Sequence, residues 1–181
     1  LVHHPMTPAD RYLWTLPMFH ANGWTFVWIV TAVGGRHVCT TDVAPETIFP
    51  LAAREGVTML CAAPTVLIMI ANASDDLRAT APRGVRVLTA GAAPAAHTIG
   101  RVEDELSWTV THVYGLTETA PLISICEMRP EHAGLSTEER ARHKSRQGVE
   151  MVTSGELRVV DQAGHDVPWD GETAGEIVVR G

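Results

Sequence analysis

The sequence predicts an α/β fold, a doubly wound and mainly parallel sheet with helices on both faces, followed by a small antiparallel β subdomain. Three observations predict it. Short β-branched segments alternate with apolar segments of helical periodicity from residue 22 to residue 113. The helical segments have about ten to fifteen residues, which suits right-handed crossovers between parallel strands. Two segments of period two, 155–161 and 175–181, then close the chain and are typical of antiparallel strands.

The first helix is expected over residues 22–33, where aromatic and aliphatic side chains recur as in a helix that is buried on most sides. A glycine pair ends it, because glycine readily adopts the left-handed conformation at a helix C-terminus. A short β-branched strand is expected over 36–41. Pro45 then begins a second helix, which ends at Gly56.

Further strand and helix units follow. Residues 57–61 and 85–89 predict strands, and residues 64–70 and 95–106 predict the helices that come after them. Residues 108–113 predict the next strand. Because ligands of such layers bind at the carboxyl ends of the strands, the turns after the last two strands are the expected places for chemistry.

The character of the chain changes after residue 127. A capping box at Ser136 begins a polar helix, which carries Lys144, the single lysine of the chain, and is expected on the surface. We therefore predict an α/β unit over 1–127, and a polar helix with the start of a β subdomain over 128–181.

Composition and charge exclude several classes of protein. The 181 residues are 45% hydrophobic and 19% charged, which is typical of a globular chain rather than a disordered one. The net charge is −7 and no basic run occurs, which counts against nucleic acid or an anionic membrane as the partner. No apolar run reaches the roughly eighteen residues of a transmembrane segment. Small-molecule substrates are therefore the expected partners.

The cysteines and histidines indicate no metal centre. Cys39, Cys61 and Cys126 are widely spaced among apolar residues, and their spacing is not that of a zinc site. An odd number in this setting predicts reduced core thiols in a cytoplasmic protein. The histidines show no pairing at metal-ligand spacing either, so no metal site built from protein ligands alone is expected.

The segment from Tyr114 to Thr119, directly after a strand, is a candidate nucleotide-phosphate site. It supplies an aromatic face, a glycine that permits close backbone approach, two hydroxyls and a carboxylate. A threonine hydroxyl can donate to a phosphate oxygen, and Glu118 can hold Mg²⁺, a cation that takes oxygen ligands. The alternative is a loop that leads into a helix capped by Thr117, because hydroxyl and acidic residues favour helix starts in general.

Two other segments are weaker candidates on their own. The small residues from Gly91 to Pro94 leave room for a flat ring against the backbone, although glycine and proline also dominate plain connecting turns. His20 and Trp24 lie near the start of an apolar helix, where they can line an apolar tunnel. A lone histidine in such a place is more often a core or capping residue than a catalyst.

In this order, and between these strands and helices, the segments resemble the adenylate-forming acyl-CoA synthetase and ligase superfamily. Four segments are similar to its signature loop, its adenine-contacting turn, its acyl-site motif and its glycine–glutamate strand, namely Tyr114 to Thr119, Gly91 to Pro94, Pro17 to His20 and Gly175 to Gly181. The resemblance covers nearly the whole chain. It is closest to bacterial medium- and long-chain fatty acyl-CoA synthetases.

The resemblance implies a reaction with ATP, Mg²⁺ and CoA as cofactors. A fatty acid and ATP would give an acyl-adenylate and pyrophosphate, and the CoA thiol would then give acyl-CoA and AMP. The resemblance implies that Tyr114 stacks on adenine beside Gly115. It further implies that Thr117 binds the α-phosphate and that Glu118 binds Mg²⁺, which makes these two the catalytic residues.

The resemblance also assigns the two weaker segments. The backbone of Gly91, Ala92 and Ala93 would pass beside the adenine, with Pro94 completing the cofactor-binding turn. His20 and Trp24 would border the acyl tunnel as substrate-binding residues, and Trp24 is a candidate gate.

The chain departs from the family in what it lacks. The phosphate-binding loop of the family, with its lysine, has no counterpart in residues 1–16, and the C-terminal lid domain with its lysine would lie beyond Gly181. Lys144, expected on a surface helix, cannot replace either lysine. We therefore interpret the chain as a fragment of a fatty acyl-CoA synthetase that is inactive alone and, with apolar surface exposed, prone to form homo-oligomers. The alternative is a stand-alone, non-enzymatic α/β binding module.

Overall fold

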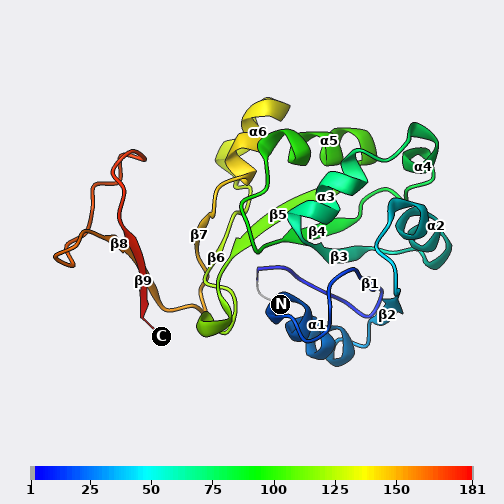
Figure 1. The fold of residues 1–181 in the computed structure, drawn as a ribbon, viewed down its shortest axis with the longest axis horizontal. Helices are drawn as coiled ribbons and strands as arrows, with labels where there is room; N and C mark the ends of the chain where they lie inside the picture. Colours follow the sequence, from blue (N-terminus) through cyan, green and yellow to red (C-terminus); the bar gives the residue numbers. More distant parts are fainter. Residues whose placement is uncertain (1–2, 181) are drawn as a thin grey trace.

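A computed structural model shows an α/β layer and a hairpin that stands beside it (Figure 1). The structure describes residues 3–180, and of Ala21, Asn22 and Trp24 it describes the backbone only. None of the helices in the described part of the chain has the length and hydropathy of a membrane-spanning segment.

The strands of the layer are β1 (Arg11–Trp14), β2 (Arg36–Cys39), β3 (Met59–Ala62), β4 (Arg86–Thr89), β5 (Thr109–Tyr114), β6 (Ser124–Ile125) and β7 (Val149–Glu150). Its helices are α1 (Ala21–Ala32), α2 (Pro45–Glu55), α3 (Pro64–Ala71), α4 (Asp75–Ala79), α5 (Ala96–Leu106) and α6 (Thr137–Lys144). Two 3-10 turns are η1 (Thr117–Thr119) and η2 (Pro130–His132), and the hairpin consists of β8 (Glu156–Val160) and β9 (Glu176–Arg180).

One seven-stranded sheet forms the centre of the layer, in the order β2-β1-β3-β4-β5-β6-β7. The strands from β1 to β5 are parallel, whereas β6 and β7 add antiparallel strands at one edge. The hairpin β8–β9 is a separate antiparallel sheet. The predicted fold class, a mainly parallel sheet followed by a small antiparallel addition, is confirmed.

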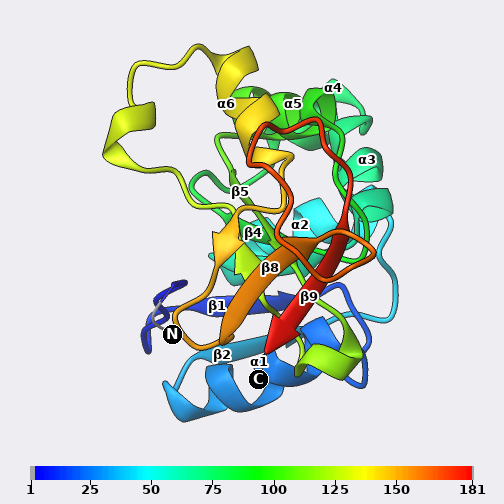
Figure 2. The same cartoon turned by 90° about the vertical axis from the view of Figure 1, so that its left-hand side faces the viewer.

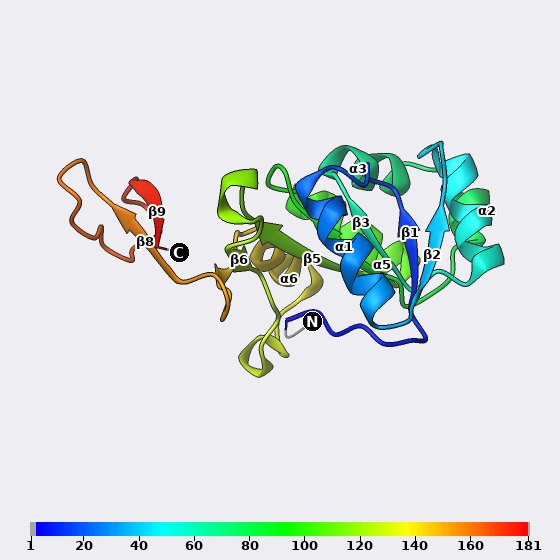
Figure 3. The ribbon, with the colours of Figure 1, turned by 90° about the horizontal axis from the view of Figure 1, so that it is seen from below.

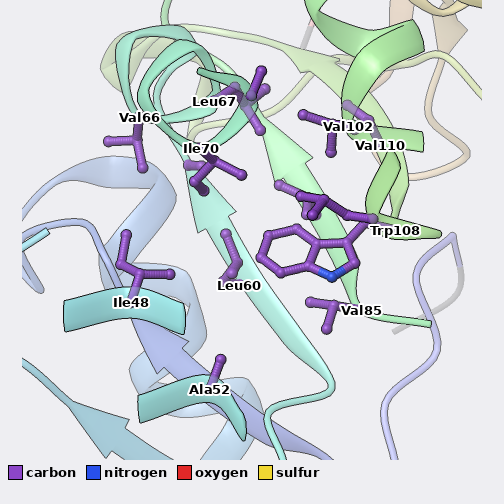
Figure 4. Close-up of a cluster of buried hydrophobic side chains, with 14 of the residues drawn as sticks. Ile48, Ala52, Leu60, Val66, Leu67, Ile70, Val85, Val102, Trp108 and Val110 are labelled. Atoms are coloured by element: carbon purple, nitrogen blue, oxygen red, sulfur yellow. The ribbon is translucent and has the colours of Figure 1, made fainter. Parts of the chain in front are cut away.

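Helices cover both faces of the sheet, with α1 on one face and α2, α3 and α5 on the other (Figures 2 and 3). Alternate residues of each strand therefore enter different cores: Leu13 and Leu60 face α2 and α3, whereas Tyr12 and Met59 face α1. Figure 4 shows the larger core, where Trp108 lies among aliphatic side chains. Its indole N–H donates to the carbonyl oxygen of Pro82 at 2.8 Å, which satisfies the one polar atom that this ring buries.

The expectation that the first helix is buried on most sides is wrong. Phe26 and Val30 of α1 are buried against the sheet, but Trp28 is 60% exposed. An all-round apolar pattern indicates burial only where another element covers the outer face, and among the described residues none covers that side of α1.

Two sequence-based expectations about burial also need correction. Cys39 is exposed, because it lies on the edge strand β2, while Cys61 and Cys126 are buried as expected; all three are free thiols. Lys144 does not lie on the surface: its side chain is 8% exposed and forms an ion pair with Glu103 of α5. The aliphatic stem of a lysine packs well at a helix contact when a carboxylate neutralises its charge.

The polar helix α6 packs against α5, and β7 completes the main sheet. Only the segment from Glu156 onward forms a second sheet. The predicted division of the chain at residue 127 stays a prediction.

Candidate functional site

The turn after β4 and the loop after β5 lie side by side at the carboxyl edge of the sheet. The two strands are paired in parallel, and Thr89 at the end of β4 is level with His112 of β5. The structure therefore brings together the predicted adenine turn, residues 91–94, and the predicted nucleotide-phosphate segment, residues 114–119, which we call the phosphate loop, although about twenty residues separate them in the chain. Gly91 has φ 94°, a left-handed value that favours glycine, and Ala92 and Ala93 beside it are exposed.

The phosphate loop doubles back on itself directly after β5. A Cβ atom on Gly115 would lie 1.8 Å from the carbonyl oxygen of Pro121, so no larger residue fits there without moving the loop. The loop then forms the short 3-10 helix η1, in which Thr117 and Glu118 are exposed. The cap position of this turn belongs to Leu116. The alternative prediction, a helix capped by Thr117, is wrong.

Thr119 fastens this loop, a role that was not predicted from the sequence. Its hydroxyl oxygen accepts a hydrogen bond from the Leu116 N–H at 2.8 Å. The same hydroxyl lies within donating distance of the carbonyl oxygens of Leu116 at 2.9 Å and Pro121 at 3.0 Å. A hydroxyl side chain three residues after the turn begins is a known local signal for such bonds, and it was available in the sequence. Thr119 thus holds Thr117 and Glu118 outward.

The exposed pair Thr117 and Glu118 fits a magnesium nucleotide. Mg²⁺ is usually held by one or two carboxylates together with phosphate oxygens and waters, so a single carboxylate beside a phosphate site is a suitable donor set. Among residues 3–180 no group of three or more His, Cys, Asp or Glu side chains could hold a metal ion by itself. A magnesium ion at Glu118 would take its other ligands from phosphate oxygens and waters.

The predicted acyl-site motif lies on the turn that leads into α1. His20 is exposed, and its backbone N–H donates to the carbonyl oxygen of Pro17 at 3.0 Å. A Cβ atom on Gly23 would lie 2.3 Å from the same oxygen, so the turn packs tightly on the helix start. The side chain of Trp24 lies outside the described residues. The substrate-binding roles of His20 and Trp24 stay predictions.

An apolar cavity of about 240 Å³ lies between α1 and the strands β4, β5 and β6. Its wall continues directly from the phosphate loop, because Ala120, Pro121 and Leu122 follow Thr119 in the chain. The other lining residues are Thr25, Phe26 and Ile29 of α1, Leu88, Val113 and Ile125 of the strands, and His3, His4, Met151 and Thr153. Among the described side chains, His20 does not line the cavity, and the residues of α1 that do are in its second and third turns.

We expect Thr119→Val to loosen the phosphate loop without unfolding the chain. Valine has the shape of threonine but cannot make the hydrogen bonds to Leu116 and Pro121, which are worth about 1 kcal/mol each. Hydrogen exchange of the Leu116 amide should therefore become roughly 5–30 times faster. Thr119→Ser, which keeps the hydroxyl, is the control and should exchange nearly as slowly as the wild type. Unchanged exchange in Thr119→Val would show that the loop is held by other contacts.

The chain is similar to one family of known proteins over its whole length. A family model described as AMP-binding enzyme matches residues 1–181. The chain is 47% identical to probable acyl-activating enzyme 4 of Arabidopsis thaliana over 171 residues, which are 94% of this chain and 31% of that protein. It is 45% identical to 4-hydroxybutyrate–CoA ligase 2 of Metallosphaera sedula over 181 residues, which are 100% of this chain and 33% of that protein.

Other relatives agree with these. The chain is 47% identical to 2-methylpropanoate–CoA ligase CCL4 of Humulus lupulus over 94% of its length and 30% of that protein. Its fold is similar to O-succinylbenzoate coenzyme A synthetase from Bacillus subtilis, solved in complex with ATP and magnesium ion. The TM-score is 0.77 at 22% identity over 99% of this chain and 34% of that one. The chain thus spans about a third of the length of the curated relatives that it matches.

Proposed function

The chain belongs to the AMP-binding enzyme family, and from this premise we propose that it is the central segment of an AMP-forming acyl-CoA ligase. In the proposed reaction a carboxylate oxygen of the acid attacks the α-phosphorus of ATP, and pyrophosphate leaves. The CoA thiol then attacks the acyl carbon, loses its proton to solvent and releases AMP. The observation that carries the proposal is the phosphate loop, which ends directly at the wall of an apolar cavity.

The exposed residues of the loop have separate proposed roles. The Thr117 hydroxyl donates a hydrogen bond to the α-phosphate, and Glu118 holds Mg²⁺ together with phosphate oxygens. A magnesium ion held there would supply positive charge against the phosphates, as in other phosphoryl and nucleotidyl transfers. Such reactions are catalysed chiefly by positioning and charge stabilisation, which a rigid loop with exposed polar groups supports.

The adenine ring is proposed to bind between the two neighbouring segments. Tyr114, half-buried at the end of β5, supplies an aromatic face beside Gly115. The backbone of residues 91–93 passes on the other side, and the buried Pro94 fixes the end of that turn. This arrangement is supported by the parallel pairing of β4 and β5, which sets the two segments next to each other.

The acyl group is proposed to enter the cavity beside α1. Two relatives are named for four-carbon acids, 4-hydroxybutyrate and 2-methylpropanoate. Their names support a short acid rather than the medium- or long-chain fatty acid that the sequence resemblance implies. His20 and Trp24 would border the entrance to this pocket.

Two further proposals concern the cellular compartment of the protein and the self-association of this chain. We propose that the protein is located in the cytoplasm. The buried free thiols of Cys61 and Cys126 support this location, because thiols stay reduced there. Self-association of the separate chain is supported by exposed apolar side chains, among them Phe19 at 86% and Trp169 at 98% exposure.

An assay of product identity tests the proposed function. We expect the full-length protein that contains this chain to release AMP and pyrophosphate only when a carboxylic acid is present, and acyl-CoA when CoA is added. The 181-residue chain alone should release none, because it contains neither of the two lysines that the resemblance implies, one in a phosphate-binding loop before this segment of the family and one in the C-terminal lid domain. Release of ADP and phosphate by the full-length protein, or turnover by the chain alone, would contradict the proposal.

A further inference from the structure

A groove of about 220 Å³, which we call the η2 groove, lies between α6 and the segment that joins β6 to α6. This segment carries η2 and projects beside α6 (Figure 2). Strand β6 runs antiparallel to β5 from the level of Tyr114, so the chain leads away from the phosphate loop before it reaches the groove. None of residues 91–94 and 114–119 lines it. Four of its lining residues carry basic side chains: Arg129, His132, His143 and Arg146.

The two histidines of the η2 groove contact each other. The ring centroids of His132, on η2, and His143, on α6, lie 4.1 Å apart. Nδ1 of His132 accepts the backbone N–H of Arg129 at 3.0 Å. The proton of the neutral His132 ring is therefore on Nε2. The two rings thus form one titratable pair at the groove.

The charged groups that act on the His143 ring are positive. The pKa of His143 is lowered, chiefly by burial. Positive charge on His132, Arg146 and Arg129 lowers this pKa further, while a hydrogen bond to the backbone of Glu127 acts in the opposite direction. The two guanidinium groups therefore lie close enough to the ring to act on it, although they come from segments on either side of α6. Such a concentration of positive charge favours a negatively charged ligand.

Two carboxylates also line the η2 groove, and each has another partner. The carboxylate of Glu127 lies 3.4 Å from Nδ1 of His3. That of Glu131 lies 3.8 Å from a guanidinium nitrogen of Arg129, but both side chains are more than half exposed, so this pair is weak. The guanidinium group of Arg146, an exposed residue, forms no ion pair or hydrogen bond with any of residues 3–180. An anion from solvent can therefore reach both arginines without breaking a buried pair.

We propose that the η2 groove binds a phosphate group, either inorganic phosphate or the phosphate monoester of a larger ligand. Guanidinium groups bind phosphate oxygens through paired hydrogen bonds, and the histidine rings beside them add N–H donors. A phosphate monoester carries about two negative charges at pH 7, which the positive groove favours. This site lies outside the proposed catalytic site, and it would stand if the proposed function were wrong.

Histidine NMR of the full-length protein tests the inference at the groove itself. The ring signals of His132 and His143, labelled with ¹³C at Cε1, are assigned with His132→Gln and His143→Gln. Inorganic phosphate is then added, with sodium chloride at equal ionic strength as the reference. We expect phosphate to shift both signals saturably and to raise the pKa of His143, because a bound anion favours the imidazolium. Sodium chloride should do neither.

Two arginine variants show whether the groove binds the phosphate. Arg146→Gln should weaken phosphate binding by roughly tenfold or more, the loss of about one charged hydrogen bond. Arg142→Gln is the matched control, because Arg142 is an exposed arginine of the same helix that pairs with Glu138 and does not line the groove. It should leave binding unchanged. If Arg146→Gln fails to fold, Arg129→Gln decides in the same way. Absence of a saturable shift, or equal affinity in the wild type and the groove variant, overturns the inference.

Coenzyme A and dephospho-coenzyme A identify the source of the phosphate group, because they differ only in the 3′-phosphate monoester. If CoA shifts the two histidine signals and dephospho-CoA does not, the groove binds the phosphate of the coenzyme. If inorganic phosphate shifts them and neither coenzyme does, the groove binds the free anion. A shift with both coenzymes but not with inorganic phosphate overturns the inference, because another part of the coenzyme is then recognised. The measurement needs no turnover, so its result is independent of the proposed function.

Discussion

Lys144→Met should lower the free energy of unfolding of the chain by about 3–5 kcal/mol, the usual cost of removing one partner of a buried ion pair. The ammonium group of Lys144 pairs with Oε1 of Glu103, and the two side chains are only 8% and 14% exposed. The same oxygen accepts the N–H of Val110 at 2.8 Å, at the start of β5. Methionine fills the space of the lysine stem but leaves the carboxylate without its cation, between α5, α6 and the sheet.

Urea unfolding followed by circular dichroism measures this effect, and two controls define its cause. Glu103→Gln combined with Lys144→Met should restore most of the stability, because a neutral amide still accepts from Val110 and no buried charge remains. Arg142→Met removes a cation from the same helix, but its pair with Glu138 is largely exposed and should cost no more than about 0.5 kcal/mol. Equal losses in the free energy of unfolding for the Lys144 and Arg142 variants would show that the buried ion pair stabilises the fold no more than the exposed one.

This ion pair explains why the predicted surface position of Lys144 on α6 is wrong. Every local signal of that helix is polar, and the capping box at Ser136 is present in the structure as expected. The partner of Lys144 lies forty-one positions earlier in the chain, so only the tertiary packing of α6 on α5 reveals it. A charged residue on a polar helix gives no sequence signal that separates an exposed position from a neutralised buried one.

Strand β1 was missed for a different physical reason. Its last three residues enter opposite cores, Tyr12 and Trp14 toward α1 and Leu13 toward α2 and α3, so no polar residue alternates with them to mark an exposed face. Four residues without alternation are too short to distinguish from a loop or the lead into a helix. The later strands were predictable because turn residues and long helical segments separate them.

The neighbouring positions of the two segments predicted to bind the nucleotide could be inferred from the sequence, whereas the cavity beside α1 could not. Glycine, hydroxyl and carboxylate residues in one short segment after a strand are a local signal, and parallel topology sets that segment beside the turn at Gly91. The cavity is assembled from α1, three strands and the N-terminal segment, which are far apart in the chain. No spacing in the sequence connects His4 with Phe26 or Ile125, so this wall appears only in the folded structure.

We expect Glu118→Gln to slow acid-dependent ATP–pyrophosphate exchange by the full-length protein by more than a hundredfold. Glutamine has the size of glutamate but no charge, so it should bind Mg²⁺ weakly beside the phosphates. Loss of one electrostatic contact in a transition state typically raises the barrier by about 3 kcal/mol, and each 1.36 kcal/mol corresponds to about tenfold in rate. The variant should also require more Mg²⁺ for half-maximal exchange, which a purely structural role of Glu118 would not produce.

The structure indicates that this loss would arise at the site and not from unfolding. Glu118 is exposed on η1, and the hydrogen bonds that hold the turn come from Thr119, so Glu118→Gln should melt within a degree or two of the wild type. Glu131→Gln makes the same change at an exposed carboxylate on η2, away from the loop, and should exchange at the normal rate. Exchange within twofold of the wild type in Glu118→Gln would remove this carboxylate from the mechanism, and the proposed magnesium site would then have no protein ligand in this chain.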